Sequence, residues 1–325
     1  MSTVYPRTVS LLTLAPLRPD ACIPAAHPWR VVLGFLLLIL SVNPQPAAAG
    51  DDRALLIGVS RYEGWTPLAN PITDVRALER VLRDHLGYRT TVLENPSRLQ
   101  VEAEIRALAQ RRYQPDDRLI IVFAGHGVYD PVSDIGYIIT ADSFASFVDP
   151  YFMSMISYPL LLNKIDAIDA PNILVVVDAC FAGSIHSARP PHRAPANRSG
   201  PIVRQFLTST GIDHAPDGAP NPASPFAARF SAGLRAIPHG RSTTIDALMN
   251  EFLAPLTPTP QLGPFGAHSG HASFSFTPPQ ARRTALRNPV APASDPHYSG
   301  ETRVLHPTSH HVDHQRPSPR PAQSP

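Results

Sequence analysis

Two apolar runs, each leading into a residue with a reactive side chain, constrain the fold of this chain more than any other feature. The first runs from Leu119 to Ala124 and continues into Gly125-His126-Gly127, and the second runs from Asn172 to Val177 and continues into Asp178-Ala179-Cys180. Short runs rich in Ile and Val are typical of buried strands in a parallel sheet. Open α/β sheets place functional side chains at the carboxyl ends of their strands. The sequence therefore predicts that both runs contribute to one site.

Amphipathic helices alternate with predicted strands from Asp52 onward. Apolar residues recur at three-to-four spacing between Ile72 and Leu86, which predicts a helix that Gly87 ends as a C-cap. Ser97 is a suitable N-cap for the next helix. The alternation predicts an α/β fold with a mostly parallel central sheet and helices on both faces. Further strands are expected at 54–59, 88–93, 137–140, 202–208 and 274–276, and further helices at 153–168, 225–234 and 244–253.

The N-terminal 49 residues resemble an export signal. An apolar segment from Val31 to Val42 follows Arg30 and precedes Ala47-Ala48-Ala49. The segment is shorter than the roughly 20 residues that span a bilayer, and the pattern is that of a signal peptide cleaved after Ala49. We therefore expect an exported bacterial protein, periplasmic or secreted, with no stable membrane span unless the signal stays uncleaved. The long extension at 1–28 is explained by an early start codon or by an uncleaved signal anchor.

The composition of the rest of the chain predicts a folded domain followed by a tail, and it argues against one class of partner. We expect one folded domain at 52–278 and a disordered tail at 279–325, because the tail is rich in Pro and His and has few apolar residues. Its scattered histidines lack the fixed spacing of a metal site. The net charge is only +2, and no cluster of Lys and Arg forms a basic face. This argues against a nucleic-acid partner.

Cys180 has no disulfide partner in the expected mature chain, because the only other cysteine, Cys22, precedes the predicted cleavage site. Two interpretations stay open for it. A free cysteine at a strand end is a candidate nucleophile, but free cysteine is also among the most buried residue types. His126 is correspondingly either a general base or a hydrogen-bonded histidine in a glycine-rich turn.

The two motifs together resemble those of caspase-like cysteine peptidases, which form peptidase family C14 of clan CD, and specifically the bacterial metacaspase type. In caspases the histidine lies about fifty residues upstream of the cysteine. The resemblance covers residues 52–278. Besides the two motifs, it includes Leu55-Leu56-Ile57-Gly58, Asn70-Pro71-Ile72-Thr73-Asp74, Gly136-Tyr137-Ile138-Ile139-Thr140-Ala141-Asp142 and Ser224-Pro225-Phe226-Ala227.

The resemblance implies a caspase-hemoglobinase-like fold and a cysteine endopeptidase that works through a Cys-His dyad. His126 would accept the proton of Cys180, and the thiolate would attack the substrate carbonyl. The backbone N–H groups of Gly127 and Cys180 would form the oxyanion hole. The family needs no third, acidic partner. Protein or peptide substrates are the implied partners.

The resemblance also implies cleavage after Arg or Lys. Asp178 and Asp74 match the positions of two acids that bind a basic side chain in metacaspases, and paired carboxylates suit a guanidinium. Each acid also has a structural interpretation. Asp178 could be a strand-end turn residue, and Asp74 could interact with the positive end of a helix dipole.

The sequence departs from the metacaspase pattern at several positions. Ala124 stands where serine is common, Pro71 replaces a pocket cysteine, and Phe181 replaces a histidine. The acidic pair that would help to bind calcium is missing, because the stretch 153–168 and its flank offer only Asp166 and Asp169. Asp142 alone is a poor site for an ion that takes six to eight oxygens. We therefore expect no metal or other cofactor and doubt calcium activation.

The segment after Cys180 suggests self-processing. It carries Arg189, Arg193 and Arg198 and no acid before Asp213. Proline follows Arg189, which disfavours cleavage there. We expect autoprocessing after Arg193 or Arg198.

Two other functions compete with the peptidase interpretation. One is a catalytically inactive caspase-like fold used for binding or regulation. The other is a non-peptidase α/β module in which Gly125 and Gly127 cradle a ligand, although the spacing of phosphate-binding loops is lacking.

Overall fold

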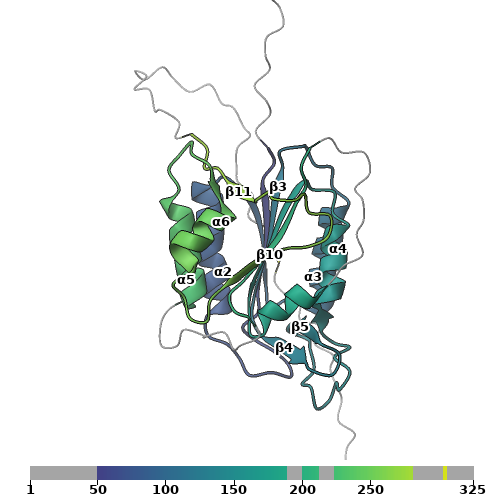
Figure 1. Ribbon diagram of the computed structural model, residues 1–325. Coiled ribbons are helices and arrows are strands. Elements are labelled where there is room, and N and C mark those ends of the chain that lie inside the picture. The colour runs from purple at the N-terminus through teal and green to yellow at the C-terminus, as the bar shows by residue number, and fades with distance from the viewer. Residues whose placement is uncertain (1–49, 189–199, 212–222, 281–302, 306–325) are drawn as a thin grey trace, which may run out of the picture. The chain divides into compact units, whose positions relative to one another are not determined.

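A computed structural model describes residues 50–188, 200–211, 223–280 and 303–305 (Figure 1). The chain separates into a unit at 1–49 and a unit at 50–325. The first unit lies outside the described residues, so the signal peptide stays a prediction, as do the domain limits at 52 and 278. Within the described part of the chain, every helix is too short or too polar to cross a membrane.

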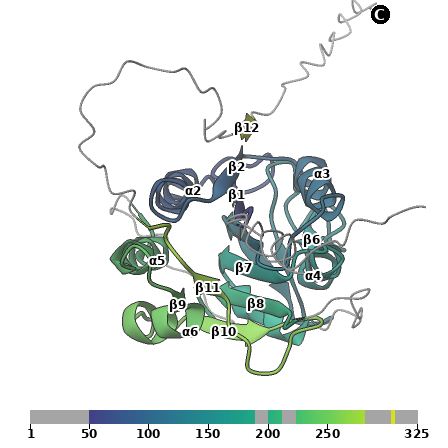
Figure 2. The same cartoon turned by 90° about the horizontal axis from the view of Figure 1, so that it is seen from above.

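A seven-stranded sheet forms the centre of the second unit, in the order β10-β8-β7-β3-β1-β2-β12 (Figures 1 and 2). All neighbouring strands are parallel except β10, which runs antiparallel to β8. The prediction of a mostly parallel sheet is therefore confirmed. Its strands are β1 (Arg53–Gly58), β2 (Arg89–Glu94), β3 (Arg118–Ala124), β7 (Asn172–Asp178), β8 (Val203–Thr208), β10 (Gln261–Pro264) and β12 (Arg303–Leu305).

Helices cover both faces of this sheet, as Figure 2 shows. One face carries α2 (Pro71–Arg80) with the π-helical turn η1 (Val81–His85), α5 (Pro225–Ala236), and α6 (Ile245–Leu248) with the π-helical turn η3 (Met249–Leu253). The other face carries α3 (Arg98–Ala109) and α4 (Tyr158–Asp166). Both faces of the central strands are consequently buried.

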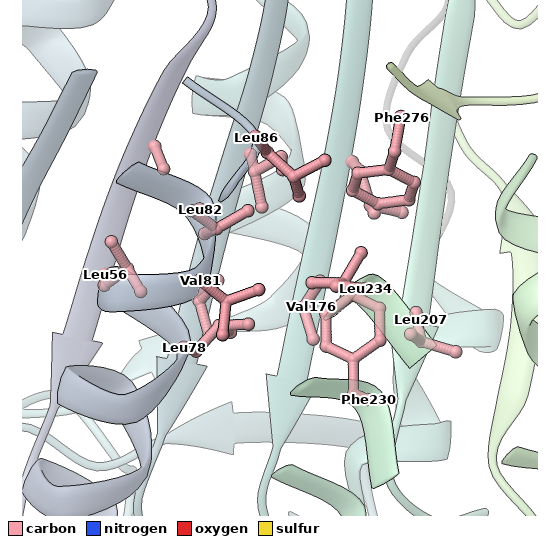
Figure 3. Close-up of a cluster of buried hydrophobic side chains, with 14 of the residues drawn as sticks. Leu56, Leu78, Val81, Leu82, Leu86, Val176, Leu207, Phe230, Leu234 and Phe276 are labelled. Carbon is pink, nitrogen blue, oxygen red and sulfur yellow. The ribbon is translucent and has the colours of Figure 1, made fainter. Parts of the chain in front are cut away.

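Burial on both faces explains the unbroken apolar runs. Alternate residues of a strand point to opposite faces, so Leu56 and Val176 pack under α2 and α5 while Leu55 and Val175 pack under α3 and α4. Figure 3 shows the first of these clusters, in which Phe230 lies against the sheet. Each such large side chain contributes about 1.5–3 kcal/mol to folding.

Helix starts follow the expected capping chemistry. Ser97 begins α3 with a capping box, in which its side chain accepts from the N–H of Gln100 and the Gln100 side chain accepts from the N–H of Ser97. The Ser224 side chain caps α5 by accepting from the N–H of Ala227, and Pro225 occupies the first helical position.

The helix predicted at 153–168 is wrong at its start. Helix α4 begins at Tyr158, because Ser157 adopts an extended conformation as the N-cap and accepts from the N–H of Leu160. Residues 143–155 instead form a series of turns, in which the Asp149 carboxylate accepts from the N–H groups of Met153 and Ser154.

Two small antiparallel sheets accompany the central one. β4 (Gly127–Asp130), β5 (Ile135–Ile138) and β6 (Ile156–Ser157) form a three-stranded sheet that continues directly from the histidine motif. β9 (Thr243–Thr244) pairs with β11 (Ser275–Phe276). The strand predicted at 137–140 is thus present two residues earlier, as β5. In the chain beyond 279, residues 303–305 pair with β2, and the remaining residues after 280 lie outside the described part.

Candidate active site

The register of β3 against β7 brings the histidine and the cysteine to one edge of the sheet. Ala124 is paired with Asp178 in this register. His126 and Cys180 each follow two residues after that pair, so the two strands deliver them at the same level. Both residues line one pocket. The structure therefore brings together the two residues that the sequence singled out.

Glycine is required beside the histidine because the two loops touch. The N–H of Gly125 donates to the carbonyl oxygen of Asp178 over 3.2 Å. A Cβ atom on Gly127 would lie 2.2 Å from the carbonyl oxygen of Cys180, far inside van der Waals contact. Any side chain at position 127 would push the two loops apart.

A backbone carbonyl orients the imidazole. His126 Nε2 lies 2.8 Å from the carbonyl oxygen of Thr66. A carbonyl only accepts hydrogen bonds, so in the neutral ring Nε2 carries the proton and Nδ1 keeps a free lone pair. This assignment makes Nδ1 the basic nitrogen of the site.

Tyr62 and Trp65 fix the surroundings of the ring. The hydroxyl of Tyr62 accepts from the backbone N–H of His126 at 2.9 Å and donates to the carbonyl oxygen of Val59 at 2.6 Å. The Tyr62 and Trp65 ring centroids lie 4.8 and 5.8 Å from that of His126. The imidazole, half-buried, is therefore held by aromatic contacts as well as by the Thr66 hydrogen bond.

Cys180 lies half-buried at the end of β7, before a sharp change of chain direction. Phe181 adopts a left-handed conformation with φ of 56°, which is uncommon for a bulky residue. The N–H and the hydroxyl of Ser184 both donate to the Phe181 carbonyl oxygen, at 3.0 and 2.7 Å. These bonds start the 3₁₀ helix η2 (Ala182–Ser187) and stabilise the turn that presents the thiol.

A buried tyrosine lies within electrostatic reach of the thiol. Tyr158 is fully buried, and its hydroxyl has no hydrogen-bond partner among the residues that the structure describes. Burial raises the pKa of Tyr158, and the charge of an ionised Cys180 raises it further. The phenol is therefore neutral at physiological pH.

The pocket beside Cys180 has a volume of about 80 Å³. Two carboxylates lie in its wall, from the first turn of α2 and from the end of β7. Asp74 is only 3% exposed, and Asp178 is partly exposed. The residues that line the pocket are Leu68, Pro71, Asp74, Ala124, Gly125, His126, Asp178, Ala179, Cys180 and Ser224.

Ser224 links the two carboxylates. Its backbone N–H lies 3.3 and 3.1 Å from the two carboxylate oxygens of Asp74, and its hydroxyl donates to Asp178 Oδ2 at 2.6 Å. The same hydroxyl oxygen accepts from the N–H of Ala227 and so caps α5. The start of α5 therefore fixes both acids in the pocket wall. These are the two acids that were predicted to bind a basic side chain of the substrate.

The pairing of β4 with β5 sets the direction of one candidate oxyanion donor. The N–H of Ile139 donates to the carbonyl oxygen of His126, so residues 126 and 139 form a hydrogen-bonded pair. In an antiparallel ladder the next pair, Gly127 and Ile138, is non-hydrogen-bonded, and its N–H groups point away from the partner strand. The Gly127 N–H is therefore not used by the β4–β5 ladder.

The acids considered for calcium make structural contacts. Asp142 accepts from the N–H of Arg98 and from the hydroxyl of Thr140, each at 2.8 Å. Asp166 forms a buried ion pair with Arg204, with an N–O distance of 3.5 Å. Among the described residues, no group of three or more His, Cys, Asp and Glu side chains is arranged to hold a metal ion.

Sequence reasoning missed the two aromatic neighbours of His126, Tyr62 and Trp65, and two further contributors to this site. The Thr66 carbonyl is a backbone group, so no residue type marks it. Ser224 did carry a signal, since serine before proline is typical of a helix start, but its contact with Asp74 and Asp178 depends on the tertiary structure.

Comparison with known proteins places the chain in a family. The family model described as a caspase domain matches residues 51–277. No curated protein matches the sequence significantly. Among solved structures, caspase-1 from Spodoptera frugiperda is similar at 14% sequence identity with a TM-score of 0.46, over 73% of this chain and 92% of that one. By its family match, this chain is a member of the caspase-like cysteine peptidases of family C14.

Proposed function

We propose that the protein is an active cysteine endopeptidase of the metacaspase type that cleaves after Arg or Lys. The observation that carries this proposal is the pocket, which is lined by Cys180, the oriented His126 and two acids. Membership of family C14 supports the reaction class, and the two acids support the specificity.

The reaction begins with a proton transfer from the Cys180 thiol to Nδ1 of His126. Nδ1 is the acceptor because the Thr66 carbonyl holds the proton on Nε2. The same carbonyl stabilises the imidazolium that results, because Nε2 keeps donating to it. The thiolate then attacks the carbonyl carbon of the substrate and forms a tetrahedral intermediate.

Backbone N–H groups stabilise the oxyanion in this proposal. The Gly127 N–H is directed away from the β4–β5 ladder, and that of Cys180 is the second donor. When the intermediate collapses, the C–N bond breaks and His126 returns its proton to the leaving amine. Water then hydrolyses the thioester and regenerates the thiol.

Specificity for a basic residue rests on Asp74 and Asp178. A guanidinium that enters the pocket meets two carboxylates whose positions Ser224 fixes. Fixed acceptors cost less side-chain entropy on binding than mobile ones. Pro71 and Ala124, where metacaspases carry polar residues, give this pocket fewer polar side chains.

Two further parts of the proposal concern residues outside the described chain. We propose export to the periplasm or the exterior, with the mature chain beginning after Ala49. Self-cleavage after Arg193 or Arg198 follows from a preference for basic residues, because the loop that holds them has no acid. Intact-mass measurement of wild type and Cys180→Ala tests the second point, and cuts after Asp213 or Asp217 would contradict it.

A thiol-reactive peptide probe with arginine at its reactive end tests the central proposal. We expect it to label Cys180 in wild type and to label the Asp178→Ala protein more slowly. A matched probe with aspartate in place of arginine serves as the control. Equal labelling by both probes would contradict the specificity, and no labelling at all would favour a catalytically inactive caspase-like fold used for binding.

A further inference from the structure

Most of the exposed large hydrophobic side chains in the described residues lie on one loop. The loop at 144–153, called here the aromatic loop, connects β5 to β6. It holds five of the seven such side chains, and Phe147 and Tyr151 are 89% and 81% exposed. Soluble proteins rarely cluster apolar side chains at the surface unless the cluster binds something. The five are Phe144, Phe147, Val148, Tyr151 and Met153.

Hydrogen bonds inside the loop hold these side chains outward. The carboxylate of Asp149 accepts from the N–H groups of Met153 and Ser154 at 2.9 and 2.7 Å and from the Ser154 hydroxyl at 2.7 Å. The same hydroxyl oxygen accepts from the N–H of Phe144 at 3.0 Å. The Asp149 carboxylate and the Ser154 hydroxyl thus lie inside the loop, while five apolar side chains are exposed on its outside.

The aromatic loop is bonded to the segment that surrounds the histidine. The indole N–H of Trp65 donates to the carbonyl oxygen of Phe144 at 3.0 Å, and the Trp65 ring also contacts the ring of His126. A Cβ on Gly64 would lie 2.6 Å from the backbone nitrogen of Ala145, so the two segments are in direct contact. The aromatic loop is therefore in contact with the segment that surrounds His126 in the candidate active site.

The pocket and the aromatic loop lie on opposite sides of the sheet edge. Asp74 of α2 and Ser224 at the start of α5 belong to one face, whereas the strands that flank the loop pack against the core under α3 and α4. Figure 1 shows β4 and β5 at the end of the sheet below α3 and α4. His126 lines the pocket and contacts Trp65, which is bonded to the aromatic loop, so His126 connects the two regions.

We propose that the aromatic loop binds apolar side chains of the substrate in the segment that follows the scissile bond. This rests on the proposed function, in which His126 protonates the leaving amine and so marks the side on which that segment departs. Residues 143–155 contain no Lys or Arg, and surfaces that bind anionic membranes are usually rich in both. An apolar polypeptide therefore fits this surface better than a lipid headgroup does.

Two matched peptides test the proposal on the full-length Cys180→Ala protein, where cleavage does not interfere. Both place arginine before the scissile bond, and they differ only in Leu-Phe or Ser-Ser at the second and third positions after it. We expect fluorescence anisotropy to show about tenfold tighter binding of the apolar peptide, the equivalent of partly burying one large side chain. Adding Phe147→Ser and Tyr151→Ser should remove this preference. Val132→Ser, which removes a 94% exposed side chain elsewhere, should not.

Separate outcomes decide the two proposals. Equal binding of both peptides, or a preference that survives the double substitution, overturns the role of the loop even if wild type cleaves arginyl amides. Failure to cleave arginyl amides contradicts the proposed function, but a loop-dependent preference in peptide binding would still support the loop. Loop-dependent flotation with phosphatidylcholine–phosphatidylglycerol vesicles, without peptide discrimination, would identify a membrane surface instead and overturn the proposal.

Discussion

The pocket and the aromatic loop lie on the two sides of His126. Each departs, in opposite ways, from the usual exposure of charged side chains and burial of apolar ones. The pocket contains one buried and one partly exposed carboxylate, whereas the loop exposes aromatic and aliphatic side chains. In each region one polar residue makes the arrangement possible, namely Ser224 between the two acids and Asp149 inside the loop. The difference suggests that a substrate is held by charge on one side of the scissile bond and by apolar contact on the other.

Substitution of the catalytic candidates between the two regions should have the largest effect on turnover. Cys180→Ala should lower turnover by about 10⁴-fold or more, and His126→Ala should come close, because members of one catalytic unit are not additive. Steady-state kinetics on an arginyl amide measures this loss. Binding of uncleaved peptide should be unchanged in Cys180→Ala, since both binding regions are intact. Full activity of Cys180→Ala would remove the peptidase interpretation.

Asp178→Ala should weaken the binding of a basic side chain in the pocket and leave the aromatic loop unaffected. We expect kcat/KM for arginyl amides to fall about 10- to 100-fold, mainly through KM, because a charged hydrogen bond to the substrate side chain contributes about 1.5–3 kcal/mol. Asp178→Asn is the matched variant, since it keeps an acceptor for the Ser224 hydroxyl and removes only the charge. If Asp178→Asn cleaves arginyl amides as well as wild type does, the carboxylate has no role in specificity. The apolar preference after the scissile bond should persist in both variants.

Asp149→Ala should disturb the aromatic loop and leave the pocket unaffected, because it removes the acceptor of two backbone N–H groups. Peptide binding to this variant should lose the preference for apolar residues, about tenfold, while cleavage of arginyl amides stays near the wild-type rate. A parallel fall in both measurements would mean that the loop supports the catalytic residues rather than the substrate.

Asp149 also predicts how the loop depends on pH. Burial acts to raise its pKa, but the hydrogen bonds from Ser154 and Met153 outweigh burial and hold the pKa below its usual value. The stabilisation from this carboxylate is therefore complete above the unfolded pKa of about 4 and is lost only as the pH falls through the lower folded value. The apolar preference should stay constant between about pH 5 and 8.

A carboxylate outside both regions should have the smallest effect on catalysis. Asp52, next to Arg118, has its pKa raised to about 6, because burial outweighs the attraction of the guanidinium. Its contribution to stability is present below about pH 4 and is lost as the pH rises through about 6, by about 2–3 kcal/mol. Thermal unfolding of Asp52→Asn should lack this decline, and its activity should equal that of wild type. If Asp52→Asn loses thermal stability between about pH 4 and 6 as wild type does, Asp52 is not the group responsible for that loss.

The sequence predicted the elements that have a regular apolar pattern, and failed where hydrogen bonds from polar side chains decide the conformation. The runs before His126 and Cys180 were recognisable as strands because burial on both faces requires unbroken apolar residues. The sequence predicts a helix from Met153, but residues 153–157 precede helix α4. Asp149 and the N-cap at Ser157 decide the conformation instead, and neither changes the apolar pattern.

The same distinction applies to the site. His126, Cys180, Asp74 and Asp178 could be named because their side chains have distinctive chemistry, and the structure lines one pocket with all four. The Thr66 carbonyl could not be named, because every residue has a carbonyl and only the fold selects this one. The short strands β4, β6, β9 and β10 were missed, whereas the equally short β5 and β11 overlap the strands expected at 137–140 and 274–276.

The pairing of Ala124 with Asp178 makes the length of each connecting segment more critical than its composition. Each catalytic candidate is separated from the paired position by a single residue, Gly125 on one strand and Ala179 on the other. One inserted residue in either segment would displace its side chain by about 3.3 Å along the strand direction, more than a proton transfer tolerates. Substitution of the buried Ala179 by another small residue is therefore a milder change than any insertion beside it.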